Sequence, residues 1–344
     1  MDAKTKRYDA LDGIRVIAML GVLVMHVLAN VSYRDELSDL YAYVMYFGRF
    51  TSLFMAVSAF SVSCGYFEKI QKEGWESIEK FYKRRYSKIL PFFAFITILD
   101  VILDFSKETV FEGFANFTLV FGLIPHESIT VIGVGWTLGV IFVFYLLYPF
   151  FVFLMRNKLR FYLACAVSII YAFVVNEYFG LGKVDFLYCA CYFLGGCYLY
   201  LQRDSIQRKL NSLALGTIIT ILIVVYYLCA FNYTPGVNII QYILFMLIIA
   251  FAIKVSDKKT ILSSRGMKYL SSISLEIYLC HMIIFRIIEK ANLLRVFDNA
   301  IISYSISCVL TFIGSVIFSI VFKRIYETIQ TRITKWRPAM KSQV

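Results

Sequence analysis

A histidine lies well inside the first apolar stretch of the chain, and two charged residues lie at the start of that stretch. Asp12 and Arg15 open it, and His26 follows Arg15 by eleven positions. In an α-helix, eleven steps of about 100° return to nearly the same face, about 16 Å further along the axis. Asp12 precedes Arg15 by three residues and joins that face. One helix face is therefore predicted to carry a carboxylate and a guanidinium near one end and an imidazole deeper in.

A neutral imidazole at that depth can act as a general base. It can remove a proton from a hydroxyl group while the hydroxyl attacks an acyl thioester. A structural histidine, hydrogen-bonded to a neighbouring helix, is about as common inside membrane spans. The face that His26 shares with Asp12 and Arg15 favours the catalytic interpretation. The sequence leaves open whether His26 acts only as a base or forms an acyl-histidine.

A cluster of cations precedes the third apolar stretch. Arg84 and Arg85 lie four and three residues before Lys88, so pairs of these cations share a helix face. Such a cluster suits a phosphate-rich ligand. On composition alone, ordinary positive charge at a cytoplasmic membrane surface is the favoured interpretation.

Five further residues inside apolar stretches are candidates for lining a substrate cavity. Ser58 also fits small-residue helix packing, while Trp136 and Tyr145 also fit an interfacial aromatic belt. Glu276 and His281 lie five residues apart, about 140° around a helix, so they are not predicted to face each other. His281 by itself also fits a packing role.

The composition identifies an integral membrane protein. Of the 344 residues, 60% are hydrophobic and only 17% are charged, which is more apolar surface than a soluble domain can bury. The net charge of +12 comes from residues in short loops between apolar stretches, which is typical of topology determination. No nucleic-acid motif is present, and the eight cysteines lack the spacing of metal ligands or a disulfide framework.

We expect an all-α polytopic protein that forms a single membrane domain over residues 1–344, with about ten spans and both termini cytoplasmic. The first span is expected to be a retained signal anchor. The stretch 110–125 is shorter and is expected to be re-entrant or interfacial. The expected spans are 12–31, 43–67, 89–106, 134–155, 160–178, 185–201, 212–231, 238–254, 270–288 and 299–322.

The order and spacing of several motifs resemble those of the acyltransferase family 3 membrane proteins. The chain departs from the family pattern in having Lys88 in place of a second arginine, and in lacking, at 141–143, a glutamate that many members carry. The matching motifs are Arg15 with His26, Ser58-Ala59-Phe60, Arg85-x-x-Lys88 with Pro91, Trp136-Thr137-Leu138, Phe144-Tyr145 with Pro149, and Ser272-x-Ser274 with Tyr278 and His281.

The resemblance implies a ten-span enzyme that uses cytoplasmic acyl-CoA to acylate a polysaccharide or a lipid-linked glycan, usually by O-acetylation. It implies that His26 is catalytic with Arg15 as its partner, and that Arg85 and Lys88 contact the CoA phosphates. No permanently bound cofactor and no metal are expected. The expected location is the plasma membrane of a bacterium, as a multi-pass protein in contact with the lipid bilayer.

Two non-enzymatic alternatives stay open. The polar helix face could bind a glycan or small solute in a transporter or flippase, although no inverted repeat or pair of interrupted half-helices is evident. A structural partner in a polysaccharide export complex is the weaker alternative. The acceptor sugar, the acyl chain and the oligomeric state also stay open, with a homo-oligomer among the alternatives.

Overall fold

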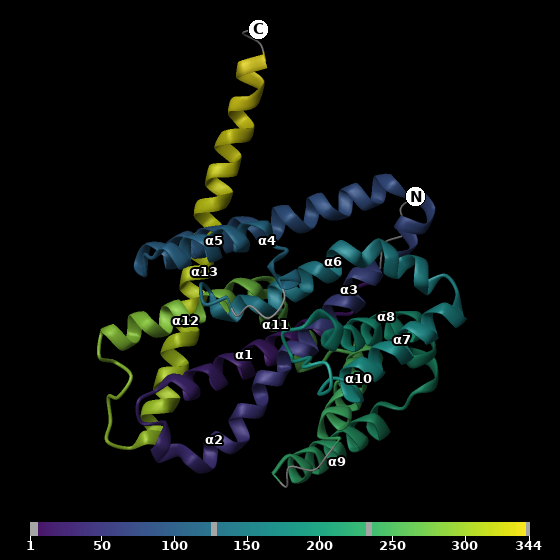
Figure 1. Cartoon of the computed structure of the whole chain (residues 1–344), viewed down its shortest axis with the longest axis horizontal. Helices are drawn as coiled ribbons and strands as arrows, with labels where there is room; N and C mark the ends of the chain where they lie inside the picture. The colour runs from purple at the N-terminus through teal and green to yellow at the C-terminus, as the bar shows by residue number, and fades with distance from the viewer. Residues whose placement is uncertain (1–5, 125–128, 232–235, 342–344) are drawn as a thin grey trace.

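The computed structural model describes residues 6–124, 129–231 and 236–341, and it contains helices but no β-strand within these ranges (Figure 1). The all-α prediction is therefore confirmed. The α-helices are α1 Ala10–Asn30, α2 Ser38–Val44, α3 Phe50–Glu73, α4 Trp75–Leu103, α5 Lys107–Thr118, α6 Trp136–Met155, α7 Lys158–Phe173, α8 Phe186–Lys209, α9 Ser212–Phe231, α10 Val237–Val255, α11 Arg265–Ser272, α12 Ser274–Lys290 and α13 Ala300–Lys341. Short 3-10 turns lie at Arg34–Leu37, Met45–Arg49, Phe121–Leu123, Gly133–Gly135 and Ile261–Ser263.

Every predicted span corresponds to a helix or to a bent pair of helices, but the count of ten is not established. Among the described residues, seven helical stretches are long and apolar enough to cross a membrane, or eight if α11 and α12, bent by 66°, form one span. Helix α7 has only 16 residues, and α8 contains tyrosines and glycines that lower its hydropathy. The seven stretches are Ala10–Asn30, Arg34–Glu73, Trp75–Leu103, Gly133–Met155, Ser212–Ala230, Val237–Val255 and Ala300–Thr331.

Helix α1 lies at the centre of the molecule, as Figure 1 shows, and packs against α3, α10, α11, α12 and α13. Its apolar residues are buried on most of its circumference, as expected for a helix that is surrounded by other helices. Gly13 allows a close approach to another backbone segment: a Cβ atom there would lie 2.6 Å from the Cα atom of Leu262. The helix that carries the candidate base is thus held by neighbours on several sides.

Small residues also allow close contacts between other helices. Where α3 and α8 cross, a Cβ atom on Gly196 would collide with the carbonyl oxygen of Ala56 and lie 2.9 Å from the Cβ atom of Ala59. Small residues let helix backbones approach closely in membranes. Helix α13 packs against α12 and the loop before it through a row of small hydroxyl residues that are 0% exposed. The row is Ser303, Ser307, Thr311, Ser315 and Ser319.

The stretch expected to be re-entrant or interfacial forms α5, a short helix that packs against α4 and does not span. A capping box between Ser106 and Thr109 starts it. Phe111 and Phe114 on its outer face are 63% and 70% exposed, which agrees with an interfacial position.

The segment before α6 is held by carboxylates from two helices. Asp100 of α4 is buried, accepts the backbone N–H of Ile132 at 3.0 Å, and pairs with Arg286 of α12 at 2.9 Å. Ile132 has a φ of +51°, which is uncommon for a β-branched residue. Glu112 of α5 accepts the backbone N–H groups of Thr130 and Val131. These contacts fix where α6 begins, and α6 forms one wall of the site.

Candidate functional site

A cavity of about 240 Å³ lies between α1, α3, α4, α6, α11 and α12. Lys88 and Ser272 are exposed and mark its open end, whereas Thr137 and Tyr278 are buried and mark its inner end. The lining residues are Arg15, Phe54, Ser58, Ser61, Arg85, Lys88, Ile89, Thr137, Leu138, Ile141, Tyr145, Ser271, Ser272, Ser274, Leu275, Glu276 and Tyr278.

Two of the cations in this cavity have no carboxylate partner within the described residues. Arg85 lies with its guanidinium carbon 5.1 Å from the ring centre of Tyr145 and 5.6 Å from that of Phe81. These are cation–π contacts, which leave the N–H groups of the guanidinium free for an anion. The Nε atom of Arg85 is buried and has no hydrogen-bond partner among the described residues. Lys88 likewise forms no ion pair with any of the described residues, so both cations are available to a negatively charged ligand in the cavity.

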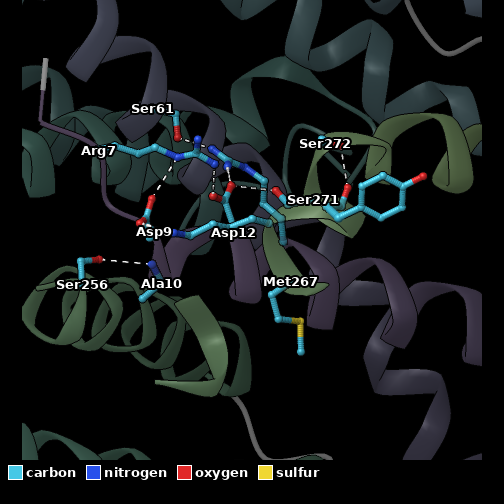
Figure 2. A network of polar contacts seen from close by, with 12 residues as sticks. Arg7, Asp9, Ala10, Asp12, Ser61, Ser256, Met267, Ser271 and Ser272 are labelled. Atoms are coloured by element: carbon cyan, nitrogen blue, oxygen red, sulfur yellow. Dashed lines mark hydrogen bonds and ion pairs between the residues drawn. The ribbon is translucent and has the colours of Figure 1, made fainter. Parts of the chain in front are cut away.

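The third cation, Arg15, is already neutralised by Asp12. Its Nη1 atom donates to Asp12 Oδ1 at 2.9 Å, and its other Nη atom donates to Ser61 of α3. Asp12 also accepts from Arg7 at 2.7 Å and from Ser271 of α11 at 2.8 Å. Figure 2 shows Asp12 between Arg7 and Ser271. The carboxylate therefore orients Arg15 and joins the chain start, α1 and α11.

A second cavity, of about 320 Å³, lies on the other side of this network. Arg15 and Ser61 line both cavities, whereas Lys6, Arg7 and Cys64 line only the second. Because Arg7 hydrogen-bonds Asp12, the pKa of its guanidinium is raised further above its ordinary value. Burial raises the pKa of Tyr8, another lining residue, to about 12. Arg7 thus remains positively charged and Tyr8 remains a neutral hydroxyl at neutral pH.

Polar groups of α3, α6 and α12 complete the first cavity. Ser58 Oγ and the Tyr145 hydroxyl lie 2.6 Å apart in a hydrogen bond. Of the lining residues, only Glu276 carries a carboxylate. It extends from α12, while the α6 wall contributes Ile141.

The two histidines inside apolar helices lie next to each other, behind the inner end of the first cavity. The ring centres of His26 and His281 are 5.3 Å apart, and neither residue lines the two cavities. Tyr278 separates them from the first cavity: its ring contacts both His281 and Phe54, at 5.9 and 5.7 Å between ring centres. The Tyr278 hydroxyl bonds the Val134 carbonyl and Thr137 Oγ1, each at 3.0 Å.

The fold brings the predicted site residues together in two groups and leaves two residues outside them. Arg84 is exposed and lines neither cavity, and Trp136 starts α6 beside the lining residue Thr137 without lining the cavity itself. The first group lines the cavity and consists of Arg15, Ser58, Arg85, Lys88, Tyr145 and Glu276. The second group is the pair His26 and His281, while Asp12 acts on the first group through Arg15.

Sequence reasoning did not single out three residues that the structure places at the site. Ser61 follows Ser58 by three residues, a helical spacing that indicates a shared face. Ser271 gave no comparable signal, because its bond to Asp12 joins residues 259 positions apart. Tyr278 belongs to the motif around His281, yet its position at the inner end of the cavity depends on the fold.

No curated protein and no solved structure matches the chain significantly. The profile of a family described as an acyltransferase domain matches residues 8–320, and so includes every residue that lines the first cavity, together with His26 and His281. The chain, a helical membrane protein with apolar helices able to span a bilayer, therefore belongs to acyltransferase family 3.

Proposed function

We propose that this membrane acyltransferase moves an acyl group, by default acetyl, from cytoplasmic acyl-CoA to a hydroxyl of an exported or surface carbohydrate in the plasma membrane of a bacterium. The observation that supports a CoA donor is the cavity in which Arg85 and Lys88 lie without a carboxylate partner among the described residues. Coenzyme A carries several phosphate charges, and cations hold such groups well. The proposal that the acceptor is a carbohydrate rests on the family resemblance.

The size and polarity of the cavity suit one part of the donor. Its volume of about 240 Å³ is below the roughly 300–1,000 Å³ of pockets that enclose whole drug-sized ligands. We infer that the phosphates lie at the open end, at Lys88 and Arg85. The thioester arm would then extend toward Phe54 and Tyr278 at the inner end.

The proposed chemistry is a direct acyl transfer with His26 as the base. The hydroxyl oxygen of the acceptor forms a bond to the acyl carbon while its proton passes to His26. The carbon–sulfur bond breaks, and the CoA thiolate then takes up a proton. Because Tyr278 separates His26 from the first cavity, thioester and imidazole meet only after the side chains at the inner end move.

A purified-enzyme assay tests this proposal directly. Release of free CoA from acetyl-CoA is measured in detergent, with glycans extracted from the host as acceptor. We expect His26→Ala to lower the rate by at least about 100-fold, the lower range for loss of a general base. His126→Ala is the matched control, because it removes the one histidine that lies outside the described residues. An unchanged rate in His26→Ala would refute the catalytic assignment.

A cellular assay separates the enzyme from the transporter. The ester content of surface glycans is compared between cells with the intact gene, a deletion, and His26→Ala at equal membrane level. We expect both altered strains to lose ester. If the deletion changes glycan export while His26→Ala leaves the ester intact, the transporter is favoured.

A further inference from the structure

The hydrogen bond of His281 determines which of its ring nitrogens carries hydrogen. Its Nδ1 atom lies 2.6 Å from the carbonyl oxygen of Tyr278, one turn earlier in α12. A carbonyl oxygen can only accept, so Nδ1 must carry the hydrogen of this bond. In the neutral imidazole only one nitrogen is protonated, and Nε2 is therefore an acceptor with a free lone pair.

That acceptor is buried without a partner. His281 is 1% exposed, and its Nε2 atom has no hydrogen-bond partner among the described residues. An unpaired buried polar atom costs about 1–3 kcal/mol, and such atoms in native structures call for an explanation. A donor that reaches Nε2 would remove this cost.

The nearest candidate donor is the imidazole of His26. Two imidazoles joined by one N–H···N hydrogen bond of ordinary length, about 3 Å, have ring centres roughly 5 Å apart. The observed separation is 5.3 Å, with the ring planes at 49° to each other. Neither ring nitrogen of His26 has another partner within the described residues. Rotation of the His26 imidazole can therefore bring one of its N–H groups to Nε2 of His281, while Nδ1 of His281 keeps its bond to Tyr278.

The neighbours of His281 hold it firmly enough to act as an orienting group. Its backbone belongs to α12, which packs against both α1 and α13. Tyr278, whose carbonyl holds Nδ1, is itself fixed by the bonds of its hydroxyl to Val134 and Thr137. The chain of contacts thus runs from the start of α6 through Tyr278 to His281 and then to His26.

We propose that His281 is a positioning residue for His26: its Nε2 atom accepts the ring N–H of His26 and leaves the other His26 nitrogen unprotonated. A base that is oriented by a third group is a recurring arrangement in nucleophilic catalysis. The pairing of the two histidines does not depend on the proposed function, but its catalytic consequence rests on it. That consequence is that His26 is held in the tautomer that can accept the proton of the acceptor hydroxyl.

The tautomer of His26 can be measured without any assay of activity. The chain has three histidines, so a His126→Gln background leaves only His26 and His281. In detergent at neutral pH, ¹⁵N spectra of the labelled imidazoles should show one neutral tautomer for each. His281→Leu should convert His26 to a mixture of both tautomers. Unchanged His26 signals in His281→Leu, or a mixture already in the parent protein, would overturn the proposal.

Two substitutions at the same position separate orientation from packing. His281→Leu fills the space but has no acceptor, whereas the amide of His281→Gln places an acceptor oxygen near the position of Nε2. We expect kcat to fall about 100-fold or more in His281→Leu, as for loss of a general base, with the KM for acetyl-CoA within twofold. His281→Gln should recover at least a tenth of the parent kcat. Equal loss in both variants, with His26 still in one tautomer, would indicate a purely structural role.

The two readouts also distinguish this inference from the proposed function. If the tautomer changes as expected but the parent protein transfers no acyl group from acyl-CoA, the histidine pair stands and the proposed reaction fails. If the parent protein is active and His281→Leu leaves both the tautomer and kcat unchanged, only the pair fails.

Discussion

At the residue scale, some charged side chains of the site have a structural role and others are available to bind a ligand. Asp12 satisfies Arg15 and Arg7, and it also accepts from Ser271. Arg85 and Lys88 have no such carboxylate among the described residues, and both line the first cavity. The paired cation is held in place by its carboxylate, while the unpaired cations are available to an anionic substrate.

The unpaired cations should affect donor affinity selectively. We expect Arg85→Ala and Lys88→Ala each to raise the KM for acetyl-CoA at least about 10-fold, because one charge-assisted hydrogen bond contributes roughly 1.5–3 kcal/mol. Arg84→Ala is the matched control, since Arg84 is exposed and lines neither cavity. Steady-state kinetics with acetyl-CoA provide the measurement.

A donor without phosphates sharpens this test. With acetylpantetheine, which has the thioester arm but no nucleotide, the two variants should match the parent protein. If they are equally impaired with both donors, the cations act on the fold or on the reacting end, and the phosphate assignment is wrong.

At the element scale, close helix packing holds α1 and α12 so that their histidines meet. Gly13 lets α1 approach Leu262, and Gly314 of α13 lies where a Cβ atom would be 2.7 Å from Ile284 of α12. The buried hydroxyl row of α13 avoids bulk on the same side. Between α3 and α8, Gly196 has the corresponding role.

The crossing of α3 and α8 should tolerate no added methyl group. We expect Gly196→Ala to destabilise the protein by about 1–3 kcal/mol, because the new Cβ atom would overpack against the backbone at Ala56. Gly65→Ala on α3 is the matched control: a Cβ atom there meets nothing within 4 Å, so helix propensity alone should make the change neutral or stabilising by roughly 0.5–1 kcal/mol. Unfolding midpoints in detergent measure both, and equal midpoints would contradict the tight crossing.

At the scale of the whole molecule, α13 connects the bundle to its C-terminal end. At about 1.5 Å per residue, its 42 residues extend roughly 63 Å, about twice the hydrocarbon core of a bilayer. Figure 1 shows the C-terminal part of α13 projecting beyond the other helices. Its exposed apolar face includes Ile313, Ile317 and Val321 and continues through Ile325 and Ile329, while charged residues appear in the helix from Lys323 and Arg324 onward. This change of character indicates where the helix leaves the membrane.

The charged end of α13 is predicted to lie in the cytoplasm. Green fluorescent protein fused after Val344 should therefore fluoresce, and alkaline phosphatase fused at the same residue should be inactive, because positive residues remain on the cytoplasmic side. An active phosphatase fusion would place this end outside and would exclude the predicted orientation.

The sequence by itself determined the helical membrane class and six of the residues that line the first cavity. Apolar stretches of the right length predict helices whichever way they pack, and charges inside such stretches are costly enough to mark a functional site. Arg15 and Glu276 were identified on these grounds, whereas Arg85 and Lys88 were identified by their helical spacing and by the family resemblance. The structure places all four in one cavity. The sequence did not determine the number of spans, because α7 is short and α11 and α12 are bent against each other.

Only the tertiary structure decided which distant residues meet. Helical periodicity relates residues a few positions apart, whereas His26 and His281 are 255 positions apart and are joined by the packing of α1 against α12. The bond of Ser271 to Asp12 and the position of Tyr278 at the inner end of the cavity have the same origin. The local sequence determines which residues share a helix face. Which other helix packs on that face is determined by close packing at residues such as Gly13 and Gly196.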